Sequence, residues 1–61
     1  MAWVAVDKDG SESIYGNKPY REDIWWIMDN EYDPMVYLPQ GTIKKLIGRE
    51  LTWDDEPVEL K

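Results

Sequence analysis

The side chains that could take part in chemistry are carboxylates and a few cations, because the 61 residues include no cysteine and no histidine. Without these two residue types the sequence excludes disulfides, iron–sulfur clusters, the common zinc sites, and catalysis by Ser-His-Asp or Cys-His groups. What remains is a set of acidic clusters and one main basic cluster.

The acidic clusters lie at residues 22–23, 29–33 and 54–56, in segments with the composition of turns. Paired carboxylates can act as acid and base, but work on a sugar needs them held across a cleft, and a chain this short leaves little material for one. Residues 7–10 resemble part of a calcium loop, yet alignment on Gly10 puts Ala5 and Gly16 at ligand positions. We therefore expect solvated loop charges, no metal, no cofactor and no enzymatic activity.

The basic cluster consists of Lys44, Lys45 and Arg49, in and just after a predicted helix over residues 42–47. Together with Thr42 at the start of that helix, these residues form a candidate anion site. A threonine at a helix N-terminus can receive a phosphate or another anion, and Trp53 or Tyr37 could stack beside it. An anion, small-ligand or nucleotide binder is therefore one alternative function, although the Walker spacing is absent. The simpler interpretation is that these cations complement the negative end of the helix dipole.

The net charge is −6, with 13 acidic against 7 basic residues. This balance disfavours binding to nucleic acid and to anionic membranes. Acidic mimicry of nucleic acid, which would inhibit a host enzyme, is a second alternative, but it needs the acids on one face and they are spread along turns. No apolar run approaches the ~20 residues of a membrane span, and no basic segment precedes an apolar one at the start, so we expect a cytoplasmic protein.

The elements that position these residues are short, because turn-forming residues recur along the chain. Alternation predicts strands at residues 2–6, 12–15, 24–28, 35–38 and 58–60, with 17–21 as a connection or edge strand and 29–34 as a polar loop. The first two strands form a hairpin whose turn ends at Gly10, which pairs Trp3 with Tyr15 and Val4 with Ile14. Gly41 or Thr42 can cap the start of the helix, and Gly48 suits its C-terminal cap. The predicted fold is α+β: one small domain over residues 1–61, with an antiparallel sheet of three to five strands in the order ββββαβ and one short helix packed on one face.

Alternation also sorts the apolar residues of the strands onto two faces of the sheet. The core face, which the helix can cover, collects Val4, Val6, Ile14, Ile24, Trp26, Met28, Val36 and Leu38. The opposite face, called here the aromatic face, collects Trp3, Tyr15, Trp25, Ile27, Met35 and Tyr37. One helix cannot cover both faces, so the aromatic face is either exposed for binding or covered by residues 51–60 or another chain.

The leading hypothesis is a non-enzymatic protein-interaction module that binds a protein partner, or a second copy as a homodimer, through the aromatic face. Residues 3–10 and 38–49, continuing through 51–53 to 57–60, resemble small proteins encoded by bacteriophages and prophages of gut bacteria. The resemblance covers most of the chain, with residues 17–35 least covered, and it assigns no catalytic residues. It implies a phage or prophage origin, the cytoplasm of a bacterial host, and a role in binding and blocking a host protein.

Overall fold

The computed structural model describes residues 2–28 and 33–61, so most of the predicted polar loop at 29–34 lies outside the described residues. The elements in chain order are β1 (Trp3–Val6), β2 (Glu12–Tyr15), β3 (Tyr20–Arg21), β4 (Trp26–Ile27), β5 (Met35–Leu38), α1 (Thr42–Ile47) and β6 (Val58–Glu59). A four-stranded antiparallel sheet has the order β5-β2-β1-β6, and β3 pairs with β4 in a separate hairpin. The predicted α+β class and the short helix are confirmed.

The β1–β2 hairpin has the predicted register, with Trp3 opposite Tyr15 and Val4 opposite Ile14. Its turn closes through hydrogen bonds from the Asp7 N–H to the Ser11 carbonyl and from the Gly10 N–H to the Asp7 carbonyl, both at 2.9 Å. Gly10 has a φ of 92°, in the region that favours glycine, as the turn requires. Local turn chemistry therefore sets the register of the central strands.

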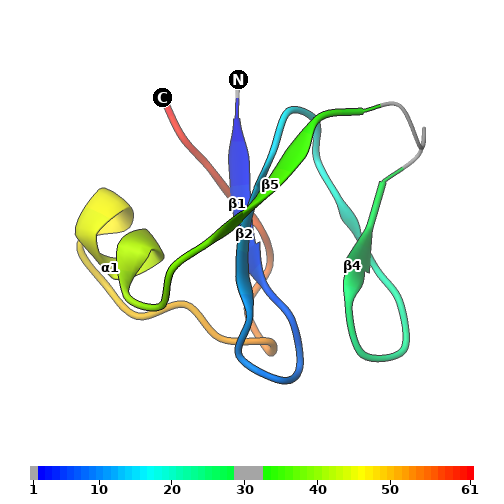
Figure 1. The fold of residues 1–61 in the computed structure, drawn as a ribbon, viewed down its shortest axis with the longest axis horizontal. Coiled ribbons are helices and arrows are strands. Elements are labelled where there is room, and N and C mark those ends of the chain that lie inside the picture. The colour runs from blue at the N-terminus through cyan, green and yellow to red at the C-terminus, as the bar shows by residue number, and fades with distance from the viewer. Residues whose placement is uncertain (1, 29–32) are drawn as a thin grey trace.

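The four-stranded sheet lies between α1 on one side and the β3–β4 hairpin on the other (Figure 1). The core between the sheet and the helix is formed by buried Val4, Val6, Ile43 and Leu51. Partly buried Ile14, Leu38, Ile47, Val58 and Leu60 pack around it. These contacts confirm that α1 packs on the core face through Ile43 and Ile47. Leu46, the third apolar residue at this helical spacing, was also expected to cover the core face but is 51% exposed.

The segment at residues 24–28 differs from the prediction. Its strand spans Trp26–Ile27 and pairs with β3 rather than with the main sheet. Trp26 and Met28 belong to a second core, with buried Ala5 and Tyr15, and so lie on the aromatic face instead of the core face. The indole Nε1–H of Trp26 donates to the carbonyl of Val6 at 2.8 Å, which fixes the hairpin over this side of the sheet. Ile24, which was also predicted for the core face, is exposed.

The first turn of α1 is capped by a residue from the sheet. Gly41 is the N-cap and makes no side-chain capping bond, while the Thr42 hydroxyl donates to the carbonyl of Pro39. The buried Glu12 carboxylate accepts instead, from the Gly41 N–H at 2.8 Å and from the Ile43 N–H at 2.9 Å. Because the carboxylate is negative, it also complements the positive end of the helix dipole. No helix in residues 2–28 and 33–61 has the length and apolar character needed to cross a membrane.

Candidate functional site

Half of the predicted aromatic face packs inside the chain, with Tyr15 buried and Trp3 and Met35 half-buried. Tyr15 is only 2% exposed, and burial raises the pKa of its hydroxyl. Trp3 and Met35 are half-buried against the cluster that Tyr15 forms with Trp26. This part of the aromatic face is a second core, because the β3–β4 hairpin covers it.

A stacked arginine fastens this hairpin to the C-terminal segment. The guanidinium of Arg21 in β3 lies 4.8 Å from the ring centre of Trp26 and 4.9 Å from that of Trp53, and the two indoles meet edge to face at 5.5 Å. Its Nη2 donates to the carbonyls of Trp53 at 2.7 Å and Asp55 at 3.1 Å. Glu56 lies 3.8 Å away. Residues 51–60 thus contribute to covering the aromatic face through Trp53, which packs against the second core.

The exposed members of the predicted surface fall into two separate elements. Trp25, at 50% exposure, and Ile27 belong to the β3–β4 hairpin, whereas Tyr37, at 71%, belongs to β5. Val36 in β5 is 59% exposed although alternation assigned it to the core face. The sequence did contain a signal for this exposure, because a helix of six residues is too short to cover every strand.

Strand β5 is an open edge of the four-stranded sheet. The Gly16 N–H donates to the Pro34 carbonyl at 2.9 Å, which makes these two residues a hydrogen-bonded pair of the β2–β5 ladder. Hydrogen-bonded and non-hydrogen-bonded pairs alternate, so Val36 and Leu38 direct their backbone groups toward β2. The N–H and C=O groups of Met35 and Tyr37 therefore point away from the sheet.

The predicted anion cluster is largely engaged within the chain. The Thr42 hydroxyl donates to Pro39, and Lys44 lies 3.4 Å from the carboxylate of Glu50. Arg49 donates to the Glu50 carbonyl at 3.3 Å. Lys45 is exposed, and Trp53, one of the two residues that could stack beside the anion, lies under Arg21. Because the Glu12 carboxylate already caps the helix, the geometry does not favour an external anion at this end.

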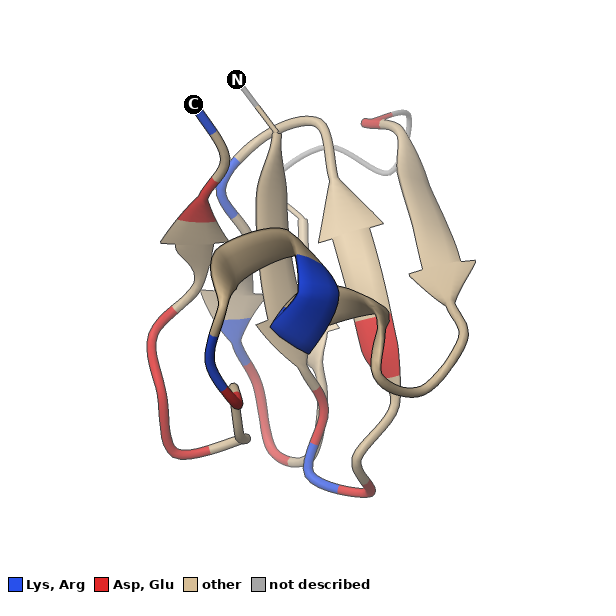
Figure 2. Cartoon of the chain, turned by 90° about the vertical axis from the view of Figure 1, so that its left-hand side faces the viewer, with Lys and Arg blue, Asp and Glu red and all other residues tan. Residues whose placement is uncertain are grey.

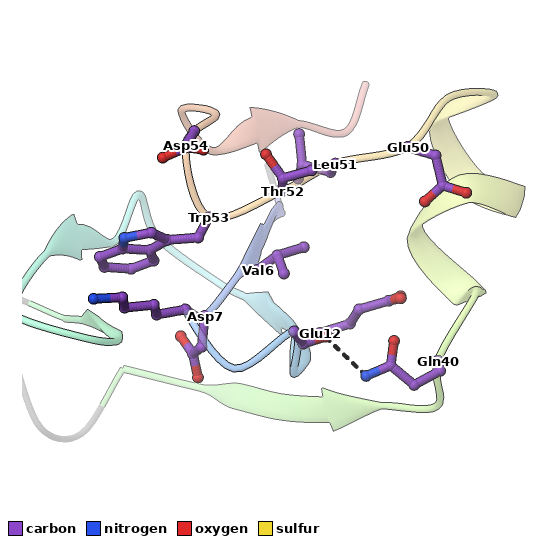
Figure 3. Close-up of a pocket in the computed structure, with 11 residues that line it drawn as sticks. Val6, Asp7, Glu12, Gln40, Glu50, Leu51, Thr52, Trp53 and Asp54 are labelled. Carbon is purple, nitrogen blue, oxygen red and sulfur yellow. Dashed lines mark hydrogen bonds between the residues drawn. The ribbon is translucent and has the colours of Figure 1, made fainter.

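A hollow of about 490 Å³ lies between the β1–β2 turn, the start of α1 and residues 50–54 (Figure 3). Its acidic walls are Asp7, Glu12, Glu50 and Asp54. Three of these are already engaged: Glu12 with the helix, Glu50 with Lys44, and Asp7 with the Trp26 N–H at 3.0 Å. Within the described residues no group of three or more acidic side chains is arranged to hold a metal ion.

The acidic residues are spread over several loops and two strands rather than gathered in one element (Figure 2). Such a spread does not reproduce the continuous charged ridge that mimicry of nucleic acid needs. The features that stand out are therefore the open edge of β5 and the exposed tip of the β3–β4 hairpin. No family model, curated protein or solved structure matches the chain, so its function has to be argued from this geometry.

Proposed function

We propose that the protein is a non-enzymatic interaction module whose contact surface is the open edge of β5, and that this edge pairs with β5 of a second copy. The observation that carries the proposal is an edge strand with two large apolar side chains in water, Val36 and Tyr37. Unpaired edges of this kind are templates for adding a strand. This surface replaces the aromatic face as a whole, because Trp3, Tyr15 and Met35 pack in the second core.

The edge is self-complementary about Val36. If two copies meet antiparallel with Val36 on the two-fold axis, Met35 of each copy lies opposite Tyr37 of the other. The backbone groups of these residues are the ones that point outward, so the pairing forms about four hydrogen bonds and leaves the ladder continuous. On one face Val36 meets its own copy, and on the other Tyr37 meets a methionine, a favourable cross-strand pair.

Charge does not oppose this pairing, although each copy carries −6. Strand β5 contains no charged residue, and the nearest in sequence is Asp33. In the proposed register the two copies of Asp33 are six residues apart along the strands, or about 20 Å. That separation exceeds the ~8 Å screening length at physiological salt.

Two prolines limit the length of the proposed β5–β5 pairing. Pro34 and Pro39 bracket the four residues of β5, and the Pro39 carbonyl already accepts from Thr42. The pairing therefore buries less surface than a standard interface, which buries roughly 1,200–2,000 Å². We expect a weak dimer, with a Kd on the order of 100 μM or higher.

Sedimentation equilibrium of the pure protein, wild type against Val36→Lys, tests this function. We expect the wild type to shift toward dimer as its concentration rises toward ~1 mM and the lysine variant to remain monomeric, because the charge would face its own copy across the axis. Leu46→Lys, which replaces an exposed apolar residue on α1, is the matched control and should dimerise like the wild type. A wild type that stays monomeric, or a Val36→Lys variant that dimerises equally, would overturn the proposal.

From the resemblance to phage proteins we further propose that the same edge accepts a strand of a host protein in the bacterial cytoplasm. Affinity capture from a host lysate with the wild type, Val36→Lys and Leu46→Lys tests this step. The expected partner is retained by the wild type and by Leu46→Lys and lost by Val36→Lys. Retention of every captured protein by all three forms would contradict it.

A further inference from the structure

The four tryptophans of the chain differ in one respect. A cation of the chain lies over three of them: Lys18 over Trp3 at 5.6 Å, and Arg21 over both Trp26 and Trp53. The described residues include every lysine and arginine of the sequence, and in this part of the chain none is stacked over Trp25. Trp25 is also half exposed, so one indole is left open to a cation from outside.

Trp25 lines a hollow of about 300 Å³ where the tip of the β3–β4 hairpin meets the β1–β2 turn. The walls of this hollow are Asp7, Lys8, Asp9, Ile24 and Trp25. The volume is at the lower end for ligand pockets, which suits one side chain rather than a whole cofactor. The hollow therefore combines two apolar residues, Ile24 and Trp25, with two aspartates and a lysine.

The backbone on both sides of Trp25 is held in place. The Lys8 N–H donates to the Ile24 carbonyl at 3.0 Å, and the Trp26 N–H donates to Asp7 Oδ1 at 3.0 Å. The Trp25 carbonyl itself accepts from the Glu22 N–H at 2.9 Å, which closes the hairpin tip. The backbone that carries Trp25 and the carboxylate of Asp7 are thus positioned before any ligand arrives, which lowers the entropic cost of binding.

The two carboxylates favour a cation in this hollow. Burial raises the pKa of Asp7, and the negative charge of Asp9 raises it further, whereas the hydrogen bond from the Trp26 N–H lowers it in part. Asp9 Oδ1 accepts the Ser11 N–H at 2.9 Å, which lowers the pKa of Asp9 and keeps it ionised. With Lys8 at the wall, the hollow retains one net negative charge. A cation bound here relieves the repulsion between Asp7 and Asp9.

We propose that this hollow binds the guanidinium of an arginine carried by a basic segment of a partner protein. The flat guanidinium can stack on the Trp25 ring while its N–H groups donate to Asp7 and Asp9. Arg21 makes the same kind of contact inside the chain, between Trp26 and Trp53 with Glu56 nearby. The site shares no residue with the β5 edge and does not depend on strand pairing.

The test is an NMR titration of the ¹⁵N-labelled full chain with a short arginine-containing peptide, following the four indole N–H signals. The matched control peptide carries citrulline, which keeps the shape of arginine and removes its charge. We expect saturable shifts centred on the Trp25 indole with the arginine peptide, and about tenfold weaker binding with citrulline. Equal effects of the two peptides, or shifts spread evenly over all four indoles, would overturn the proposal.

Variants of the chain separate this site from the β5 edge. Trp25→Ala should abolish saturable binding of the arginine peptide, and Asp7→Asn with Asp9→Asn should weaken it about tenfold while leaving acceptors for the Trp26 and Ser11 N–H groups. Tyr37→Ala, another exposed aromatic residue, and Val36→Lys should bind the peptide like the wild type. Unchanged binding by Trp25→Ala would contradict the site, and loss of binding by Val36→Lys would show that the peptide occupies the β5 edge instead.

Discussion

The carboxylate of Glu12 in β2 holds the first turn of the helix, because its Oε1 accepts the backbone N–H of Ile43 at 2.9 Å. Ile43 lies 31 residues further along the chain. This bond joins the central strand β2 to α1 and leaves Ile43 buried against Val4 and Val6. A six-residue helix has little stability of its own. The position of α1 therefore depends on this buried contact.

Replacing Glu12 should weaken the whole fold. We expect Glu12→Ala to lower the free energy of unfolding by about 2–3 kcal/mol, because two helix N–H groups lose a charged acceptor in a buried site. Glu12→Gln keeps one acceptor oxygen and should cost about half as much. Urea unfolding followed by circular dichroism measures both values. If Glu12→Ala were as stable as the wild type, water would have to satisfy these N–H groups and the contact would not hold the helix.

The neighbouring tryptophans should respond differently to truncation. Trp26→Ala removes the centre of the second core and should cost about 3–5 kcal/mol. Trp25→Ala removes a half-exposed side chain and should cost about 1 kcal/mol or less. Thermal and urea unfolding of both variants provide the comparison. If Trp26→Ala does not fold, Trp26→Phe takes its place, because it keeps an aromatic ring but loses the N–H that donates to Val6. Equal losses at the two positions would mean that the hairpin does not dock as described.

The Arg21 stack can be tested with a conservative change. Arg21→Lys keeps the charge near Glu56 but loses the flat group between Trp26 and Trp53, so we expect a loss of about 1 kcal/mol in the free energy of unfolding. Lys18→Arg is a useful control, because it places a flat cation over Trp3 without touching this stack. An Arg21→Lys variant as stable as the wild type would indicate that charge alone fastens the hairpin.

Asp7 and Asp9 should affect the pH dependence of stability with opposite signs. The pKa of Asp7 is raised above its ordinary 3.8, so the folded state holds this proton more tightly than the unfolded state. The contribution of Asp7 to the free energy of unfolding therefore falls as pH rises from about 3.8 through the folded pKa. Asp7→Asn should therefore gain stability relative to the wild type across that range. The pKa of Asp9 is lowered by its hydrogen bonds with Ser11, so the ionised carboxylate stabilises the folded state and this stabilisation is lost as pH falls below 3.8. Because Asp9→Asn lacks this carboxylate, it should lose stability relative to the wild type as pH rises.

Urea unfolding at a series of pH values between about 3 and 7 measures these differences. Asp7→Ala is the companion variant, since it also removes the acceptor for the Trp26 N–H and should be less stable than Asp7→Asn throughout. Parallel curves for the wild type and both asparagine variants would rule out the assigned shifts.

Local patterns predicted the parts of the fold that local chemistry determines. Gly10 fixes the β1–β2 turn, and Gly41 and Gly48 bound the helix at the predicted residues. The face of residues 24–28 could not be predicted, because every position there is apolar and alternation gives no preference between the two sides. Contacts with residues distant in sequence decide it, through Asp7 and through the Arg21 stack.

The candidate surface was predictable only in part for the same reason. The sequence identified Trp25, Ile27 and Tyr37 as residues without a cover, and they are exposed. It grouped them with Trp3, Tyr15 and Met35, which the hairpin covers. It also assigned Val36 to the core, because alternation gives the face of a residue but not how far the helix extends across the sheet.

Amide hydrogen exchange in β5 is the most direct test of an open edge that pairs with its own copy, because it reports on each residue of the strand separately. In dilute protein we predict slow exchange for Val36 and Leu38, which pair with β2, and fast exchange for Met35 and Tyr37. In concentrated protein, exchange at Met35 and Tyr37 should slow as β5 pairs with its copy, and Val36→Lys should prevent this change. Equal protection of all four amides in dilute protein would show that the β5 edge is not open, and protection independent of concentration would show that β5 does not pair with a second copy.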